Sequence, residues 1–122
     1  MLFRSKLYAN KAGNVDNEIV PTAVFSQPSN GTVGLTEAQA REKFSDIDVY
    51  KTDFKPMKNT LSGSSERTFM KMLVVRSTDK VVGMHMVGPE AGEIIQGFAV
   101  AIRAGATKAI FDSTIGIHPT AA

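Results

Sequence analysis

His85 and His118 are the residues best suited to proton transfer near neutral pH, because imidazole is the side chain that titrates in that range. Pro119 follows His118 and biases the backbone of His118 toward an extended conformation, which limits the directions in which its ring can point. A histidine held in this way could donate or accept a proton during a reaction. An ordinary core or surface histidine is the alternative interpretation for both residues.

Motifs for other kinds of catalytic or binding site are missing from the sequence. It contains no glycine-rich motif that could hold a phosphate group, and residues 62–65 do not match the GxSxG pattern of a serine nucleophile. The chain has no cysteine, so it can form neither a disulfide nor a thiolate-bound metal site. Two histidines far apart in the sequence make a poor metal site. We therefore expect no metal, and the motifs assign no cofactor to these residues.

The composition is typical of one soluble domain. The chain has 122 residues, of which 43% are hydrophobic, enough for one core and too few for two ordinary domains. Fourteen Lys and Arg against twelve Asp and Glu give a net charge of +2, and the charges are scattered. Nucleic acids and anionic membranes are bound by clustered basic residues, so we expect neither partner. The longest apolar run, residues 94–102, is too short to span a membrane, and we expect a cytoplasmic protein.

The first half of the chain predicts short strands, one helix and a long loop. Short β-compatible runs predict three strands, at residues 21–25, 32–35 and 47–53. Thr36 and Gln39 have the spacing of a capping box, which predicts a helix from Thr36 to about Phe44. Residues 54–66 contain proline, asparagine, glycine and three serines, so we expect an irregular loop there.

Two apolar, β-branched runs joined by a short polar turn predict a β-hairpin, formed by residues 67–76 and 81–87. Alternate side chains of a strand point to the same face of a sheet. One face of the predicted hairpin comprises Met70, Met72 and Val74 on the first arm and Val82, Met84 and Met86 on the second. A methionine-rich face could bind an adaptable partner, but a hydrophobic core is the simpler interpretation.

The strongest predicted helix covers residues 90–104 and ends before Gly105. Its apolar residues continue around the helix, so we expect it to be buried on more than one side. Gly97, Ala101 and Ala104 form a face of small residues that another element could approach closely. That element could be a partner subunit or part of the same domain, and the residues alone leave both possibilities open.

The last elements complete the prediction of the fold. Residues 107–112 predict a short helix, and residues 113–122, which include His118, predict an extended terminal segment. The order of strands and helices shows no repeating βα unit. We therefore predict the α+β class, with a mostly antiparallel sheet and helices packed on one side.

Several separated motifs occur together and in the order found in one known family. They lie at residues 20–28, 33–36, 54–60, 97–101, 105–108 and 117–120, the last reading Ile-His-Pro-Thr. Together they resemble the C-terminal dimerisation domain of the glutathione reductases, in the pyridine nucleotide-disulfide oxidoreductase family. The resemblance covers residues 19–122, whereas residues 1–18 match loosely and are expected to be an arm or linker at the end of a preceding domain.

The resemblance implies a dimerisation domain of a homodimeric flavoenzyme that reduces glutathione disulfide, with FAD and NADPH bound by other domains. The histidine of the His-Pro-Thr motif reaches the partner's active site in that family, so the resemblance implies that His118 is the acid–base residue. It further implies that His118 and Pro119 lie beside the flavin, and that Met57 and Thr120 contact glutathione. The implied dimer interface comprises Ile94, Gly97, Phe98 and Ala101.

Some features separate this chain from relatives of that family. Lipoamide dehydrogenases usually have a second histidine where this chain has Gly116, and mercuric reductases end in a cysteine pair. In the glutathione reductases the motif continues, beyond the position of Ala122, into two glutamates, one of which orients the imidazole. We therefore expect the isolated chain to be truncated before that pair and inactive.

Three alternative interpretations remain. The chain could be the same domain of another disulfide reductase, such as trypanothione reductase. It could be a stand-alone homodimerisation module. It could also be an unrelated domain that binds a small ligand and shares the α+β pattern.

Overall fold

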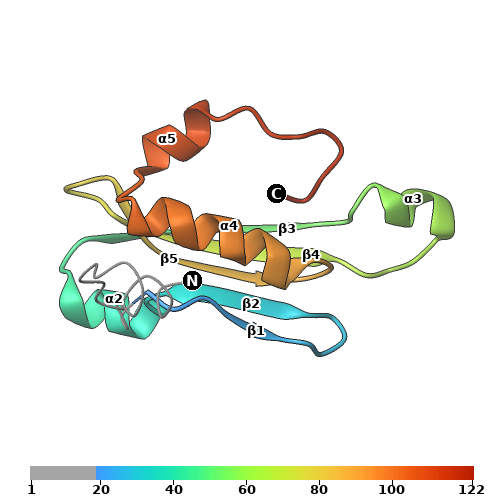
Figure 1. The fold of residues 1–122 in the computed structure, drawn as a ribbon, viewed down its shortest axis with the longest axis horizontal. Coiled ribbons are helices and arrows are strands. Elements are labelled where there is room, and N and C mark those ends of the chain that lie inside the picture. Colours follow the sequence, from blue (N-terminus) through green and yellow to red (C-terminus); the bar gives the residue numbers. More distant parts are fainter. Residues whose placement is uncertain (1–18) are drawn as a thin grey trace, which may run out of the picture.

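A five-stranded antiparallel sheet in the order β1-β2-β5-β4-β3 forms the centre of the computed structural model (Figure 1). The model describes residues 19–122, so the arm predicted at residues 1–18 lies outside the described residues. The strands are β1 (Thr22–Val24), β2 (Asn30–Gly34), β3 (Ile47–Phe54), β4 (Thr68–Val75) and β5 (Lys80–Val87). The helices are α2 (Glu37–Lys43), α3 (Lys58–Ser62), α4 (Ala91–Arg103) and α5 (Lys108–Ser113). None of these helices is long and apolar enough to cross a membrane.

The predicted α+β class and antiparallel sheet are confirmed, and the two faces of the sheet form two hydrophobic clusters. The larger cluster lies between the sheet and α4, and includes Val74. Its neighbour Leu73 points to the opposite face and packs with Ala40 of α2. The prediction of helices on one side therefore holds for α4 and α5, whereas α2 covers the other face. The reason is that consecutive residues of β4 are apolar at this end, so both faces need cover.

The helix predicted from the capping box is confirmed as α2. Gln39 donates its backbone N–H to the Thr36 hydroxyl at 3.3 Å, and Thr36 donates its backbone N–H to Gln39 Oε1 at 2.9 Å. These two bonds satisfy amide groups that the first turn of a helix leaves without partners.

The predicted hairpin is confirmed as β4 and β5, but a β-bulge changes one of its faces. The register shifts between Leu73 and Val74, which leaves Val82 as an extra residue on β5. Val82 packs with the cluster beneath α2, and Val81 occupies the position on the methionine-rich face beneath α4 that was predicted for Val82. The prediction for Val82 was wrong because strict alternation cannot anticipate a bulge. The methionine-rich face is part of the hydrophobic core, as the simpler interpretation predicted.

The loop predicted at residues 54–66 contains a short helix, α3, that the sequence did not indicate. The side chain of Asn59 is buried, and its Nδ2 donates to the Glu66 carbonyl at 3.0 Å. Gly63 ends the helix in the left-handed conformation, with φ of 71°. The hydrogen bond between Asn59 and Glu66 spans the loop and holds the loop in a compact shape at the end of β3.

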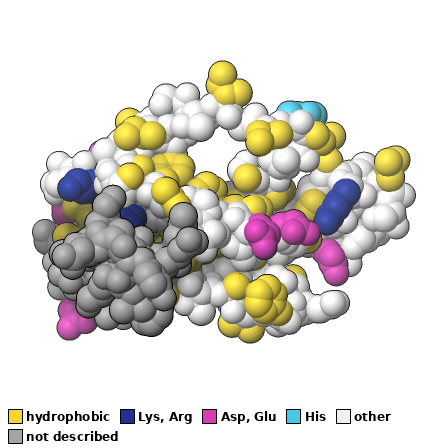
Figure 2. Space-filling view, in the orientation of Figure 1, with side chains coloured by type: hydrophobic (Ala, Val, Ile, Leu, Met, Phe, Trp, Pro, Cys, Tyr) yellow, Lys and Arg dark blue, Asp and Glu magenta, His cyan; other side chains and the backbone are white. Residues whose placement is uncertain are grey.

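The predicted long helix is confirmed as α4, with Gly105 following it at φ of 78°. One side of α4 is buried against the sheet through Ala91, Ile95, Ala99 and Ile102. A second side is covered in part by α5, where the Phe98 and Phe111 rings pack edge to face with centroids 5.7 Å apart. Val100 remains 65% exposed, and Figure 2 shows hydrophobic side chains around the opening between α4 and the α5 segment. The domain therefore covers α4 incompletely.

Gly31 lets α4 pack directly on the backbone of β2. A Cβ atom at this position would lie 2.6 Å from the Ala91 carbonyl oxygen and 2.8 Å from Ile95 Cγ1. Contacts that short do not occur, so any larger residue would push α4 away from the sheet.

We predict that Gly31→Ala lowers the free energy of unfolding by about 1–3 kcal/mol, the usual cost of overpacking a tight contact. Urea denaturation followed by circular dichroism measures this change. Gly116→Ala is the matched control, because a Cβ there lies 3.9 Å from its nearest neighbour, the Ala122 oxygen. Equal midpoints for the two variants would contradict the prediction.

Candidate functional site

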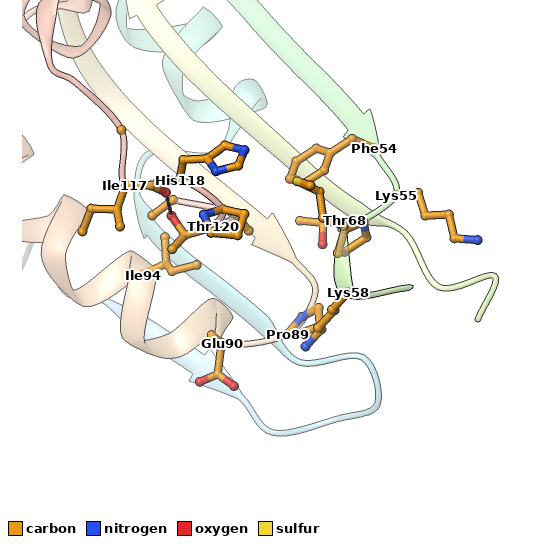
Figure 3. Close-up of a pocket in the computed structure, with 16 residues that line it drawn as sticks. Phe54, Lys55, Lys58, Thr68, Pro89, Glu90, Ile94, Ile117, His118 and Thr120 are labelled. Carbon is orange, nitrogen blue, oxygen red and sulfur yellow. Dashed lines mark hydrogen bonds between the residues drawn. The ribbon is translucent and has the colours of Figure 1, made fainter. Parts of the chain in front are cut away.

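A pocket of about 700 Å³ opens where the C-terminal segment, the loop after β3 and the start of α4 meet (Figure 3). Its lining comes from residues 54–58, Thr68, residues 89–90, Ile94 and residues 116–122. Most of these side chains are apolar, and the polar or charged ones are Lys55, Lys58, Thr68, Glu90, His118 and Thr120. A concave apolar pocket with a few polar groups is the usual form of a small-molecule site.

One wall of the pocket is the C-terminal segment that carries His118. A turn spans Ile117 to Thr120, and both the backbone N–H and the hydroxyl of Thr120 donate to the Ile117 carbonyl, at 2.9 and 2.7 Å. Ala121 packs against the hydrophobic cluster beneath α4, which fixes the segment to the domain. The segment is therefore a turn at this point rather than fully extended, and it presents an exposed imidazole.

The opposite wall is the loop between β3 and β4. Met57 lies at the start of α3 and is 62% exposed, although methionine is usually buried. The structure brings together Met57, His118, Pro119 and Thr120, which were identified as site residues from separate parts of the sequence. Their individual roles stay predictions.

The polar and charged lining residues that were not identified from the sequence include Lys58, Glu90 and Thr68. Lys58 and Glu90 are exposed charged residues, and Thr68 is fully buried with no hydrogen-bond partner for its hydroxyl among the described residues. Lys58 was one of several charges in a predicted loop, and Glu90 was one acid at the start of a predicted helix. Nothing in the sequence indicated that β4, the loop and α4 meet here.

The residues predicted for the dimer interface lie together along one side of α4. Ile94, Gly97, Phe98 and Ala101 all line a groove of about 560 Å³ between α4, α5 and the C-terminus. Gly97 is exposed, and a Cβ there would meet nothing within 4 Å. Ile94 lines both the groove and the pocket, so the two surfaces are continuous.

His85 lies on the other face of the sheet and takes no part in the pocket. Its Nε2–H donates to the Leu35 carbonyl at 3.0 Å. Burial lowers the pKa of His85, and the charge of Lys71 lowers it further, against the opposing effect of the bond to Leu35. His85 is therefore an ordinary, partly buried histidine of the fold. His118 is left as the acid–base candidate. Residues 19–122 contain no group of three side chains that could hold a metal ion.

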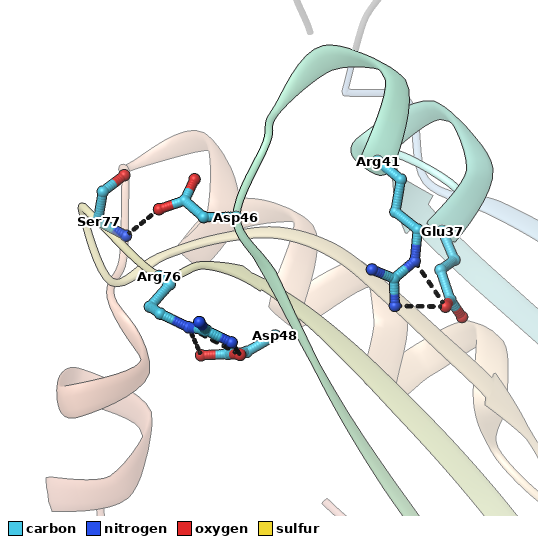
Figure 4. A network of polar contacts seen from close by, with 6 residues as sticks. All are labelled: Glu37, Arg41, Asp46, Asp48, Arg76 and Ser77. Carbon is cyan, nitrogen blue, oxygen red and sulfur yellow. Dashed lines mark hydrogen bonds and ion pairs between the residues drawn. The ribbon is translucent and has the colours of Figure 1, made fainter.

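None of the residues that form ion pairs within residues 19–122 lines the pocket, and some of the pairs join different elements of the fold. Arg76 binds the Asp48 carboxylate through Nε and Nη2, and Asp46 accepts the backbone N–H of Ser77 at 2.9 Å (Figure 4). On α2, Glu37 accepts from Arg41 at 2.9 Å (Figure 4) and from Lys71 of β4 at 2.6 Å. The Glu37–Lys71 pair anchors α2 to the sheet.

Comparison with a solved structure first defines the class of the domain. The HOCl-induced flavoprotein disulfide reductase RclA from Escherichia coli superposes with a TM-score of 0.84 at 25% identity, covering 98% of this chain and 28% of that chain. The family model for the pyridine nucleotide-disulphide oxidoreductase dimerisation domain matches residues 20–122, and the chain belongs to this family. The predicted resemblance is thereby confirmed.

Relatives with a high sequence identity are glutathione reductases. The chloroplastic and mitochondrial glutathione reductase of Pisum sativum is 57% identical over 116 residues, which are 95% of this chain and 21% of that protein. The glutathione reductase of Burkholderia cepacia is 52% identical over 120 residues, 98% of this chain and 27% of that protein. The chain thus spans about a quarter of the length of these relatives.

We predict that Glu37→Gln reduces the acid sensitivity of the fold. Hydrogen bonds from Lys71 and Arg41 lower the pKa of Glu37 from 4.5 to about 2. Because the folded state holds this proton less tightly than the unfolded state, the stabilisation is present above pH 4.5 and is lost as the pH falls toward about 2.

Urea denaturation at a series of pH values tests this expectation. The profile of Glu37→Gln is expected to be flatter than that of the unmodified chain between pH 4.5 and 2. Glu42→Gln, at an exposed position of α2, is the control and should retain the original slope. Identical slopes for Glu37→Gln and the unmodified chain would contradict the role given to this ion pair.

Proposed function

We propose that residues 19–122 form the dimerisation domain of a homodimeric flavoenzyme that uses NADPH to reduce glutathione disulfide. The observation that carries the proposal is the convergence of Met57, His118 and Thr120 on one pocket. The 57% identity to a glutathione reductase supports the same substrate. The domain boundary near residue 19, with a preceding arm, is part of this proposal.

His118 is the residue that moves the proton in this reaction. Each glutathione thiolate released from a disulfide must take up a proton, and an imidazolium is a suitable donor. The ring of His118 is exposed on the pocket wall and bonds to no other residue in 19–122, so it is accessible to a substrate or to a partner subunit. Met57 and Thr120 lie on the walls that the peptide part of the substrate would contact.

The described residues fit a flavin only along its edge. A dinucleotide is usually held by a glycine-rich turn before a helix, and residues 19–122 contain none. His118 and Pro119 are exposed, and their segment is proposed to approach the edge of a ring system held by other domains. FAD held by the other domains would relay electrons from NADPH toward the disulfide.

The homodimer is proposed to form along α4 and α5. Ala101 and Gly97 give a surface with little side-chain bulk, and large apolar residues surround it. Ile110 is 54% exposed and Ile115 is 94% exposed. Exposed apolar surface of this kind is typical of an interaction site.

We predict that Ala101→Glu weakens self-association at least about tenfold, because it places an uncompensated charge in the interface. Sedimentation equilibrium of the 122-residue chain measures the dissociation constant. Gln96→Glu adds the same charge at an exposed position on another side of α4 and should leave the constant unchanged. An equal effect of the two substitutions, or none from either, would show that the interface lies elsewhere.

A hybrid enzyme tests the catalytic role of His118. In the pea glutathione reductase, residues 19–122 replace only the matching residues of the dimerisation domain, and the pea residues beyond the position of Ala122, where the resemblance implies the glutamate pair, are kept. Reduction of glutathione disulfide is followed by the loss of NADPH absorbance. The hybrid is expected to be active, and His118→Gln in it should lower kcat about 10²–10⁴-fold. His85→Gln is the control, because His85 lies outside the pocket. Full activity of the His118→Gln hybrid would refute the assignment.

The cytoplasm is the proposed compartment. One relative is named as chloroplastic and mitochondrial, so the family is not confined to the cytoplasm. Fractionation of source cells with an antibody to this domain tests the location, and recovery with organelles would contradict it.

A further inference from the structure

Two opposite charges lie on the rim of the pocket, and neither has a partner in the domain. Lys58 and Glu90 both line the pocket, and neither forms an ion pair or a side-chain hydrogen bond within residues 19–122. Figure 3 shows the Lys58 side chain directed toward Pro89, next to Glu90, whereas Lys55 points away from the pocket. The pocket lining thus includes the ammonium group of Lys58 and the carboxylate of Glu90, both without an ion-pair partner among residues 19–122.

The carboxylate of Glu90 also makes no hydrogen bond to α4, the helix that Glu90 precedes. Glu90 is the N-cap residue of α4, yet its side chain makes no capping bond. Its backbone adopts a φ of 62°, a conformation uncommon for a residue with a side chain. The carboxylate is therefore available to a ligand rather than committed to the backbone of α4.

A buried hydroxyl lines the same pocket without a partner. Thr68 is 0% exposed, and its Oγ1 makes no hydrogen bond among the described residues. A Cβ at residue 88 would lie 2.8 Å from this oxygen, so Gly88 provides the space that the hydroxyl occupies. Buried polar groups are nearly always hydrogen-bonded, so an unpaired one beside a pocket points to a ligand or an ordered water.

From these three groups we infer that Lys58, Glu90 and Thr68 form a subsite for a zwitterionic amino-acid head group. Lys58 binds the carboxylate, Glu90 binds the ammonium, and the Thr68 hydroxyl adds a hydrogen bond when the ligand is seated. The inference rests on the proposed function, because a γ-glutamyl disulfide carries such a head group at each end. It makes Lys58 and Glu90 determinants of specificity, separate from the proton transfer assigned to His118.

The test is an NMR titration of the ¹⁵N-labelled 122-residue chain with three disulfides. Glutathione disulfide carries both charges of the head group, 3,3′-dithiodipropionate carries only carboxylates, and cystamine carries only ammonium groups. The unmodified chain is expected to bind glutathione disulfide most tightly, with shifts at the amides of Met57, Lys58, Glu90 and Ala91.

Charge-neutralising variants assign the contacts. Lys58→Gln and Glu90→Gln should each weaken the binding of glutathione disulfide about five- to tenfold. Lys58→Gln should in addition abolish binding of dithiodipropionate, and Glu90→Gln should abolish binding of cystamine. Lys55→Gln is the matched control on the same loop and should change none of the three affinities. Thr68→Val should weaken glutathione disulfide binding without lowering the urea midpoint, because the hydroxyl that it removes has no partner in the free domain.

The outcomes separate this inference from the proposed function. If the Lys58→Gln, Glu90→Gln and Lys55→Gln variants bind glutathione disulfide equally, or if the unmodified chain binds none of the disulfides, the subsite is overturned. This result would hold even with an active hybrid enzyme. If Lys58 and Glu90 determine binding but His118→Gln leaves the hybrid fully active, the subsite is upheld and the proposed catalytic role fails.

Discussion

The close approach of α4 to β2 at Gly31 is the contact on which the rest of the structure depends. It sets α4 directly on the sheet, with the Ala91 carbonyl where a side chain at residue 31 would otherwise lie. The position of α4 in turn places Glu90 and Ile94 in the pocket and aligns Gly97 and Ala101 along the groove. The C-terminal turn that carries His118 is then held by Ala121 against the cluster that α4 closes. One backbone contact thus positions both surfaces proposed for function.

The two surfaces share residues, so one domain could serve both the proposed interface and the proposed catalytic site. Ile94 lines both cavities, and the segment with Ile115 and Ile117 leaves the groove to form the wall of the pocket. A partner subunit that covers the groove would therefore come to lie beside His118. Pairing and proton transfer are coupled through the same few residues in this account.

Sequence reasoning predicted most of the elements and the residues that carry the family motifs. The capping box at Thr36, the hairpin and Gly105 after α4 are local signals, and each was confirmed. Val82, the face covered by α2 and the short helix α3 were missed, because a bulge, the packing of a second face and the Asn59 bond to Glu66 depend on residues distant in sequence. Lys58, Glu90 and Thr68 were missed for the same reason: only the folded chain places them around one pocket.

The most direct test of the central claim is the mass of the native polypeptide that carries these residues. An antibody to residues 54–67 captures it from the source cells, and intact mass spectrometry with an absorbance spectrum characterises it. The account predicts a species several times heavier than 13.1 kDa, yellow with bound flavin. A colourless species of 13.1 kDa would contradict it and would indicate a stand-alone dimerisation module.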